Sequence, residues 1–421
     1  MKIAVVGTGI SGLVTAHLLH GEHDLTLFEA GDHVGGHTNT VDVETPSGKL
    51  AVDTGFIVFN EKTYPNFCAL LREIGVPWKE SDMSFSVRCE STGLEYNGTS
   101  LNSMLAQRLN ALKPSFWSMV RDILRFYKES PAVLNSDDEE LTLGQYLDQN
   151  RYGKPFIDKH LIPMGAAVWS ATPESMRSFP LRTLVRFFHN HGFLQVDERP
   201  QWLVIEGGSR EYVGPLTAPF RDSIRLRTPV VNVERAFDGV MVTTKDGERE
   251  HFDRVVLACH SDQALRMLSN PTSAEREVLS AIPYQRNEVV LHTDQSLMPR
   301  KKLAWASWNY HLLDPPSPLP TVTYWMNMLQ SLEASEDYFV TLNRSEDIAP
   351  DKVLRKIVYH HPIYDLGAPI AQSRHGEIDG VGGVHFCGAY WGYGFHEDGV
   401  RSALAVARNL DIDVPIAEVV S

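Results

Sequence analysis

The sequence has few cysteines, no excess of basic residues and no long apolar run. Its four cysteines (Cys68, Cys89, Cys259 and Cys387) stand far apart, without a CxxC pair, which argues against a disulfide framework and predicts reduced thiols in a cytoplasmic protein. The net charge of −14 argues against a nucleic-acid partner, which would need a basic face. Because no apolar stretch reaches the length of a membrane-spanning helix, and the first residues show no signal-peptide pattern, we expect a soluble protein.

The chain does have the length and composition of a globular protein with more than one core. It has 421 residues, of which 43% are hydrophobic and 22% charged. Chains of this length usually divide into domains, so we predict two, interleaved in the sequence. Histidines cluster at 189–191 and at 360–361, but without a carboxylate or thiolate at ligand spacing. We therefore predict no metal site.

The N-terminus carries the pattern of a dinucleotide-binding turn. An apolar strand over 2–7 leads into a GxGxxG sequence, and a helix is expected over 13–21. The turn is Gly7-Thr8-Gly9-Ile10-Ser11-Gly12. The first glycine makes the turn, the second lets the backbone approach a diphosphate, and the third lets the helix pack on the strand. The diphosphate would then lie at the positive N-terminus of the helix.

An acidic residue completes this pattern at the end of the second predicted strand. Glu29 follows Gly12 by 17 residues and is placed to accept hydrogen bonds from a ribose diol. An acid at this position favours a free 2′-hydroxyl. The residues themselves thus predict FAD or NAD rather than NADP.

Two further segments follow Glu29 and carry closely spaced glycines. They read FEAGDHVGGHTNT (Phe28–Thr40) and LAVDTGFIVFN (Leu50–Asn60). Together with the first turn they resemble the amine-oxidase and phytoene-desaturase superfamily of flavoproteins, which implies FAD as the cofactor. The resemblance implies cofactor contacts by Ala30, Gly35, Gly36, His37, Thr38, Thr54, Gly55 and Phe56. Where that superfamily usually has an arginine after or near the glycine pair, this chain has His37 and Thr38.

Later segments match the same superfamily. The segment VIEGGSREYVGPL (Val204–Leu216) resembles its second Gly-Gly segment, and a β-meander is expected over 226–259. The resemblance implies that Val231, in this meander, offers its backbone to the adenine.

The C-terminal stretch FCGAYWGYGFHEDGV (Phe386–Val400) completes the resemblance. It implies that Gly388 lies over the diphosphate or the ribityl chain, and that Gly399 and Val400 contact the pyrimidine end of the flavin. No cysteine occupies the position usual for a covalent flavin link, since Cys387 directly precedes Gly388. We therefore predict non-covalent FAD.

The resemblance also implies the fold. We predict the α/β class (α+β overall), with a GR2-type Rossmann-like FAD-binding domain built from residues 1–80, 200–265 and 378–421. Residues 81–199 and 266–377 are predicted to form an interleaved substrate-binding domain of mixed sheet and helices. Its first part has apolar residues at helical spacing, with Pro114 near a helix start. In its second part, alternation along TYWMNM predicts Tyr324, Met326 and Met328 on one face of a strand.

Two features of the second domain have two interpretations each. The many aromatic and methionine side chains between 305 and 328 either form plain core or partly line an apolar tunnel for a long substrate. The basic amphipathic segments Phe116–Lys128 and Met176–Phe188 are either solvated helix faces or contacts with anionic lipid. We expect a cytoplasmic protein, and lipid contact would place it at the inner face of the membrane.

Amine oxidation fits the sequence poorly. Amine oxidases of this superfamily often have an aromatic residue three positions before the glycine of the last helix, where this chain has His396. They also tend to carry a lysine near the flavin N5, in the strand after a motif like IPY. The corresponding stretch here, IPYQRNEVVLH, has none.

A narrower resemblance comes from GGHTNTV, DTGFIVFN and FCGAYWGYGFHEDGVRSA taken together. These motifs are similar to FAD-dependent oxidoreductases associated with cyclopropane fatty-acid synthases. The resemblance implies hydride transfer at the flavin N5 to or from an unsaturated or methyl-modified fatty acyl chain. It also implies a cyclopropane-synthase-like methyltransferase as a partner.

The candidate catalytic residues are His396, Trp391 and Tyr393. His396 would transfer the proton, oriented by Glu397 or Asp398, or else it is a hydrogen-bonded histidine of a helix cap. Trp391 and Tyr393 would shape the pocket beside the flavin or simply pack the loop. The alternatives to an acyl desaturase or reductase are a flavin amine oxidase, a redox-neutral isomerase or mutase, and a non-catalytic FAD-binding partner of a lipid methyltransferase.

Overall fold

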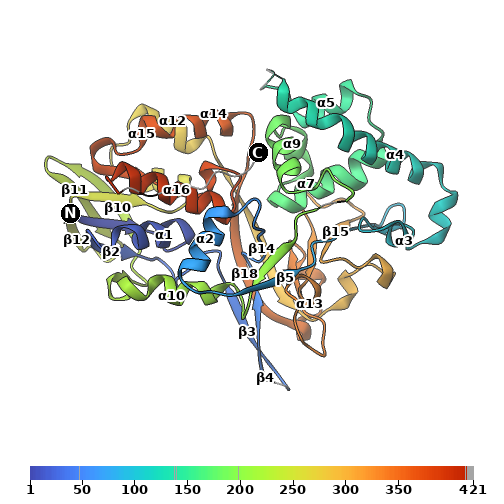
Figure 1. Ribbon diagram of the computed structural model, residues 1–421, viewed down its shortest axis with the longest axis horizontal. Coiled ribbons are helices and arrows are strands. Elements are labelled where there is room, and N and C mark those ends of the chain that lie inside the picture. Colours follow the sequence, from blue (N-terminus) through green and yellow to red (C-terminus); the bar gives the residue numbers. More distant parts are fainter. Residues whose placement is uncertain (47, 137, 139, 198, 413, 415–421) are drawn as a thin grey trace.

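The computed structural model of the protein describes residues 1–46, 48–136, 138, 140–197, 199–412 and 414 (Figure 1). Within these residues the strands form a five-stranded parallel sheet, a seven-stranded mixed sheet, one three-stranded sheet and two two-stranded sheets. Figure 1 shows the parallel sheet and its helices on one side of the molecule, and the seven-stranded sheet with a separate layer of helices on the other. The predicted α/β class with a Rossmann-like parallel sheet is confirmed.

The parallel sheet has the strand order β19-β13-β1-β2-β9. Its strands are β1 (Lys2–Val6), β2 (Asp24–Phe28), β9 (Ile224–Arg225), β13 (Arg254–Leu257) and β19 (Val384–Phe386). β1 is apolar at successive positions because both faces of the sheet are covered. Ile3 and Val5 pack with α1 (Ile10–Leu19) and α16 (His396–Asn409), whereas Ala4 and Val6 face the opposite layer.

That opposite layer is the predicted meander. It consists of β10 (Val230–Ala236), β11 (Gly239–Thr244) and β12 (Arg249–Phe252), paired antiparallel in chain order. Apolar side chains of these strands, such as Val233, Val242 and Phe252, join the core under the parallel sheet. Four short helices pack on the meander side: α11 (Ser261–Met267), α12 (Ser273–Ser280), α14 (Gly367–Ser373) and α15 (His375–Ile378). Another, α10 (Val213–Thr217), packs with α1 on the other face of the parallel sheet.

Glycines allow α1 to approach the parallel sheet and α16. A Cβ added at Gly12 would lie only 2.0 Å from the carbonyl oxygen of Gly7, and one at Gly399 would lie 2.7 Å from Cγ2 of Ile10. Gly7 also has a φ of +107°, a conformation that L side chains rarely adopt. The positions of α1 and α16 therefore depend on the absence of these side chains.

The seven-stranded sheet has the order β18-β14-β17-β16-β15-β6-β7. Its strands are β6 (Phe85–Cys89), β7 (Leu94–Asn97), β14 (Tyr284–His292), β15 (Trp308–Leu312), β16 (Val322–Trp325), β17 (Phe339–Leu342) and β18 (Val353–Pro362). The predicted alternation beyond Trp325 is wrong, because β16 ends there and Met326 begins the short helix α13 (Met326–Leu329).

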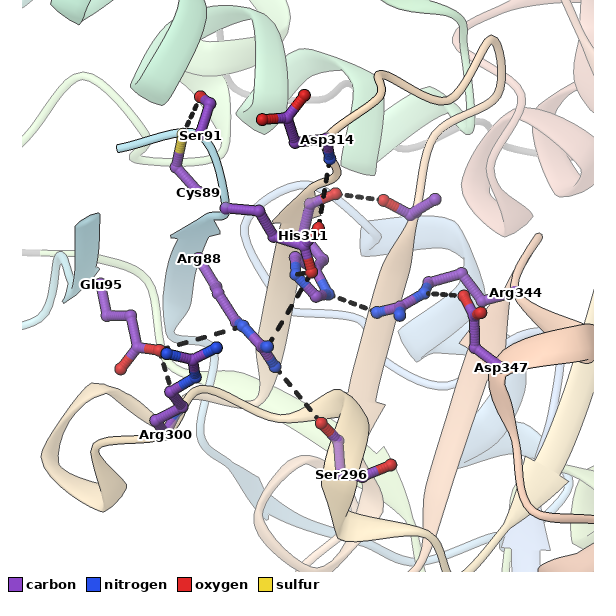
Figure 2. A network of polar contacts seen from close by, with 12 residues as sticks. Arg88, Cys89, Ser91, Glu95, Ser296, Arg300, His311, Asp314, Arg344 and Asp347 are labelled. Carbon is purple, nitrogen blue, oxygen red and sulfur yellow. Dashed lines mark hydrogen bonds and ion pairs between the residues drawn. The ribbon is translucent and has the colours of Figure 1, made fainter. Parts of the chain in front are cut away.

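A network of polar side chains crosses the parallel pair β6–β15 (Figure 2). Arg344 donates to Nδ1 of His311 and pairs through its Nε with Oδ2 of Asp347 at 2.9 Å. Burial and the neighbouring arginines lower the pKa of His311 to about 3, so its contact with Glu90, 2.9 Å from Nε2, is not an ion pair. The network ties β6 and β15 to the residues that follow β14 and β17.

The helical layer beside this sheet comes from residues 101–190. It contains α3 (Leu101–Met104), α4 (Pro114–Glu129), α5 (Leu143–Gln149), α6 (Lys154–Phe156), α7 (Ile162–Trp169), α8 (Pro173–Arg177) and α9 (Leu181–Asn190). Pro114 is the first residue of α4, as predicted. Among the described residues, no helix is both long and apolar enough to cross a bilayer.

Short elements connect the two sides. They are β3 (Thr40–Thr45), β4 (Gly48–Asp53), α2 (Pro65–Glu73), β5 (Trp78–Ser81) and β8 (Trp202–Ile205). β5 and β8 pair antiparallel where the chain leaves for the second sheet and where it returns. The division into two domains at the boundaries given above stays a prediction.

Candidate active site

A cavity of about 780 Å³ is lined by both large sheets. Residues at or just after the carboxyl ends of β1, β2, β13 and β19 form one wall. Side chains of β14, β15, β16, β17 and β18 contribute the other. In open α/β sheets ligands bind outside the carboxyl ends of the parallel strands. The cavity is therefore where the fold places a ligand.

The N-terminus of α1 opens into the cavity beside the glycine turn. Gly7, Gly9, Ile10 and Ser11 line it, and Gly12 lies behind them against the strand. The helix has no side-chain cap and no acidic residue in its first turn, so its first N–H groups are available to a ligand. A Cβ at Gly9 would meet nothing within 4 Å and would project into open space. This arrangement fits a diphosphate.

Glu29 lines the same end of the cavity. One of its oxygens accepts hydrogen bonds from the backbone N of Thr8 at 3.0 Å and from the Thr8 hydroxyl at 2.5 Å. The other accepts from the N of Gly31 at 2.7 Å. Because each carboxylate oxygen has two lone pairs, Glu29 can hold this turn and still accept from a ribose hydroxyl.

The second glycine turn packs directly on the first. A Cβ at Gly36 would lie 3.1 Å from the Cα of Gly9, and Gly35 and Gly36 have φ values of +125° and +60°. The turn brings His37 into the cavity wall, where its ring stacks on Tyr359 with 4.8 Å between centroids. Nε2 of His37 is buried and has no hydrogen-bond partner among the described residues. A buried polar atom of a residue in the cavity wall fits a ligand that would hydrogen-bond to it.

Histidines from three separate segments meet at this point. His361 lies 5.5 Å and His260 6.3 Å from His37 between ring centroids, and His360 also lines the cavity. Burial lowers the pKa of His260 and of His361 to about 4, and that of His37 well below its ordinary value. No sequence motif marks His260 as a site residue, although it follows the buried strand β13, whose carboxyl end faces the cavity.

The predicted flavin segment forms the next part of the wall. Thr54, Gly55 and Phe56 line the cavity together with Ala30 and Val231. The carboxylate of Asp53, directly before them, is buried and accepts hydrogen bonds from the backbone N and the hydroxyl of Ser209, both at 2.9 Å. Asp53 thus joins the flavin segment to the second Gly-Gly segment.

Some predicted residues lie beside the cavity rather than in its wall. Gly388 and Tyr393 line it, but Thr38, Trp391, Gly399 and Val400 do not. Val400 is buried in the core with α1, and Trp391 packs on His375 with 4.2 Å between ring centroids. These positions support the wall from behind.

His396 is the first residue of α16 and lines the cavity. Its ring stacks on Phe56 with 3.5 Å between centroids, and its Nε2 lies 3.0 Å from the hydroxyl of Thr38 and 3.3 Å from that of Tyr212. Burial lowers the pKa of His396 to about 3. The imidazole is therefore neutral at neutral pH.

The expectation that Glu397 or Asp398 orients His396 is wrong. Glu397 accepts hydrogen bonds from the backbone N and side chain of Asn66 and from the N of Phe67, and so caps the N-terminus of α2. Asp398 accepts from the backbone N of Tyr393 and of Phe395, both at 3.0 Å. Both carboxylates hold backbone because they lie at helix starts, where N–H groups need acceptors.

The remaining wall is apolar and aromatic. It is formed by Met83, Val168, Trp169, Phe187, Phe193, Trp202, Val289, Trp308, Tyr324, Leu342 and Phe395. Among the lining residues Glu29 is the sole carboxylate and Arg266 the sole permanent cation. The ring-rich segment divides between core and cavity wall: Trp305 and Trp325 pack on each other with 5.2 Å between centroids, whereas Trp308 and Tyr324 line the cavity. A tunnel for a long substrate stays a prediction.

Together, the uncapped helix N-terminus, the open space at Gly9 and the orphaned Nε2 of His37 fit FAD. The fold and this site define an FAD-dependent oxidoreductase, and the predicted cofactor is confirmed. The chain belongs to the family of flavin containing amine oxidoreductases, whose family model matches residues 10–411. The resemblance to this superfamily is thereby confirmed, while the narrower one stays a prediction. Non-covalent binding of FAD also stays a prediction. Cys387 is buried and is not part of the cavity wall.

Individual relatives differ in what they act on. The chain is 26% identical to (S)-6-hydroxynicotine oxidase of Paenarthrobacter nicotinovorans over 281 residues, which are 65% of this chain and 63% of that protein, less than two thirds of its length. A putrescine oxidase triple mutant superposes with a TM-score of 0.69 at 16% identity, over 97% of this chain and 98% of that one. A CLA-producing fatty acid isomerase from P. acnes gives 0.68 at 15% identity, over 97% and 98%.

Proposed function

We propose that this oxidoreductase desaturates or reduces an unsaturated or methyl-modified fatty acyl chain. FAD, when bound, exchanges a hydride with a substrate carbon at its N5. The protein supplies an apolar channel that holds the chain against this atom and excludes water.

The observation that carries the proposal is the composition of the cavity wall beyond the cofactor segments. Trp169, Phe187, Val289, Trp308 and Leu342 offer apolar surface from both the helical layer and the seven-stranded sheet. An acyl chain gains about 0.8 kcal/mol for each CH₂ that it buries on such a surface. A bound ammonium would have no carboxylate partner there, because Glu29 lies at the first glycine turn. An unpaired buried charge is costly.

A proton must accompany the hydride, and the two candidate catalytic side chains in the wall suit different directions. The neutral imidazole of His396, a weak base with a pKa of about 3, could accept a proton from the carbon next to the one that loses hydride, which is desaturation. Burial raises the pKa of Tyr393 to about 12, so its phenol stays protonated and could donate to a carbon that receives hydride, which is reduction. Trp391, outside the wall, would only support the loop.

Amine oxidation is the second candidate. It is supported by the 6-hydroxynicotine oxidase relative and by the many rings of the wall, whose faces attract cations. The neutral His396 and the apolar Val289 of β14, in the strand after the IPY motif, favour the acyl substrate.

Anaerobic flavin bleaching separates these functions. FAD-loaded protein is mixed with phospholipid bearing unsaturated or methyl-branched chains, and separately with a panel of amines, while the absorbance of oxidised flavin is recorded. Bleaching by lipid supports a desaturase. Bleaching by NAD(P)H followed by reoxidation with unsaturated lipid supports a reductase. Bleaching by amines alone would overturn the proposal. Mass spectrometry of membrane lipids from cells with and without the gene identifies the product.

A further inference from the structure

Residues 101–128 keep large apolar side chains on the outside of the protein. Leu109 is 74% and Leu112 80% exposed, and Leu101, Trp117 and Leu124 are also exposed. They belong to α3, to the 3-10 turn Arg108–Leu112 and to α4. Figure 1 places α3 and α4 at the end of the molecule farthest from the meander β10–β12. Grouped exposed side chains of this kind mark interaction sites more often than single ones do.

The exposed residues are not the core-facing stripe of α4. Phe116, Met119, Ile123 and Phe126 fill that role and are buried. Trp117 and Leu124 lie on the outer face of the same helix.

The indole of Trp117 is also tied to the neighbouring turn. Its Nε1 donates to the carbonyl oxygen of Ala111 at 2.8 Å. This bond ties α4 to the turn that carries Leu109 and Leu112.

Cations surround this surface. The segment 101–128 contains five basic residues and one acidic residue in a chain whose net charge is −14. Arg108, Lys113, Arg121 and Lys128 are exposed, whereas the single acid, Asp122, is buried. Its carboxylate accepts from the backbone N of Gly153 at 2.9 Å and pairs with the Arg121 guanidinium at 3.3 Å. The local charge is thus opposite to that of the whole protein.

We propose that this surface docks the protein on a bilayer that contains anionic lipid. We define the docking surface as Leu101, Leu109, Leu112, Trp117 and Leu124 with Arg108, Lys113, Arg121 and Lys128. The leucines and the indole enter the boundary between headgroups and acyl chains, and the cations contact lipid phosphates. Trp is well suited to this boundary because its ring is apolar and its N–H is polar.

The charges favour a membrane over a second copy of the chain. An isologous dimer through this surface would bring the same cations face to face. The other basic amphipathic segment, 176–188, lacks the apolar part, because Leu181, Leu184, Val185, Phe187 and Phe188 are all buried. Of the two predicted lipid contacts, the structure favours the first.

Vesicle sedimentation tests the proposal without any turnover, so a negative result is separate from failure of the proposed reaction. FAD-loaded protein is spun with vesicles of phosphatidylcholine alone and of phosphatidylcholine with phosphatidylglycerol. We expect binding to the anionic vesicles that weakens as salt is added. The double variant L109S/L112S should bind at least about tenfold more weakly. K113Q/K128Q should lose affinity and salt dependence together.

The hairpin β10–β11 and the turn after β11 provide matched controls. Phe237 is fully exposed, and Lys245 is exposed nearby. F237S and K245Q should bind anionic vesicles as the unchanged protein does, and flavin content confirms folding of every variant. Equal binding by L109S/L112S, or equal binding to neutral vesicles, would overturn the proposal. So would a dimer in light scattering that L109S/L112S converts to a monomer, because the surface would then be an interface between copies.

Discussion

The ring of His37 stacks on that of Tyr359, with 4.8 Å between centroids and 27° between planes. The contact joins the second glycine turn to β18 of the seven-stranded sheet, so one residue pair connects the cofactor side of the cavity to its roof. It also fixes the imidazole, whose buried Nε2 has no hydrogen-bond partner within the described part of the chain. The superfamily's arginine would hold a permanent charge here, whereas this histidine is neutral until a ligand arrives.

We expect FAD affinity to depend on pH through His37. Burial holds the pKa of His37 well below its ordinary value in the empty site, whereas a diphosphate beside the ring would raise it. Binding then takes up a proton. Affinity should rise as pH falls from 8 to 6, by up to about tenfold per pH unit for one proton. Fluorescence titration of the apoprotein with FAD measures this dependence.

Two variants control for this pH effect. H37A should weaken FAD binding and reduce its pH dependence, leaving what His260 and His361 contribute. H37R should bind FAD with little change between pH 6 and 8, because an arginine is always charged. If H37A keeps the affinity and the pH dependence of the unchanged protein, His37 does not hold the cofactor.

The glycines of the first turn should separate binding from stability. G9A places a methyl group in open space where the diphosphate would approach, so FAD affinity should fall at least about tenfold while the loss of a glycine cap costs about 1 kcal/mol of unfolding free energy. G12A drives a Cβ to 2.0 Å from the oxygen of Gly7 and should cost more than about 3 kcal/mol. Urea unfolding of the two apoproteins measures the loss of unfolding free energy in G9A and in G12A. Equal destabilisation by the two substitutions would contradict this assignment.

The cofactor half of the site could be predicted from the sequence because its residues act through backbone. Gly7, Gly9, Gly35, Gly36 and Gly388 occupy turns that a short pattern defines, and each lines the cavity. Local spacing is sufficient where a turn, a strand end and a helix start determine the geometry.

The roof of the site could not be predicted in the same way. His260, Tyr359 and His361 reach the cavity through strand pairing over long sequence distances, such as Gln285 with His361 in β14–β18. Nor does the triplet His-Glu-Asp reveal that its three side chains diverge. Glu397 turns to α2 and Asp398 to the loop before its own helix, because buried backbone N–H groups there require acceptors.

His396 should show no ionisation in the neutral range. Burial lowers its pKa to about 3, so His396 does not change its charge between pH 5 and 8. Any inflection of kcat/KM in this range should therefore be the same in the wild-type enzyme and in H396Q. Loss of the hydrogen bond to Thr38 in H396A should cost about 1 kcal/mol of unfolding free energy, beyond the loss of stacking on Phe56. An inflection near pH 6.5 that disappears in H396Q would make His396 a titrating acid or base instead.

Asp398 should make the protein less stable as pH rises. Burial raises its pKa to about 7 from an ordinary 3.8, so the folded protein keeps a proton that the unfolded chain releases. The stability that this proton contributes is present below about pH 4 and is lost as pH rises to about 7. The unfolding free energy of the wild type minus that of D398N should therefore decline across this window and stay level above it.

Buried histidines titrate in the same window, but they are common to both proteins and cancel in the difference. A flat difference for D398N would mean that Asp398 is ionised in the folded protein, held by the N–H groups of Tyr393 and Phe395.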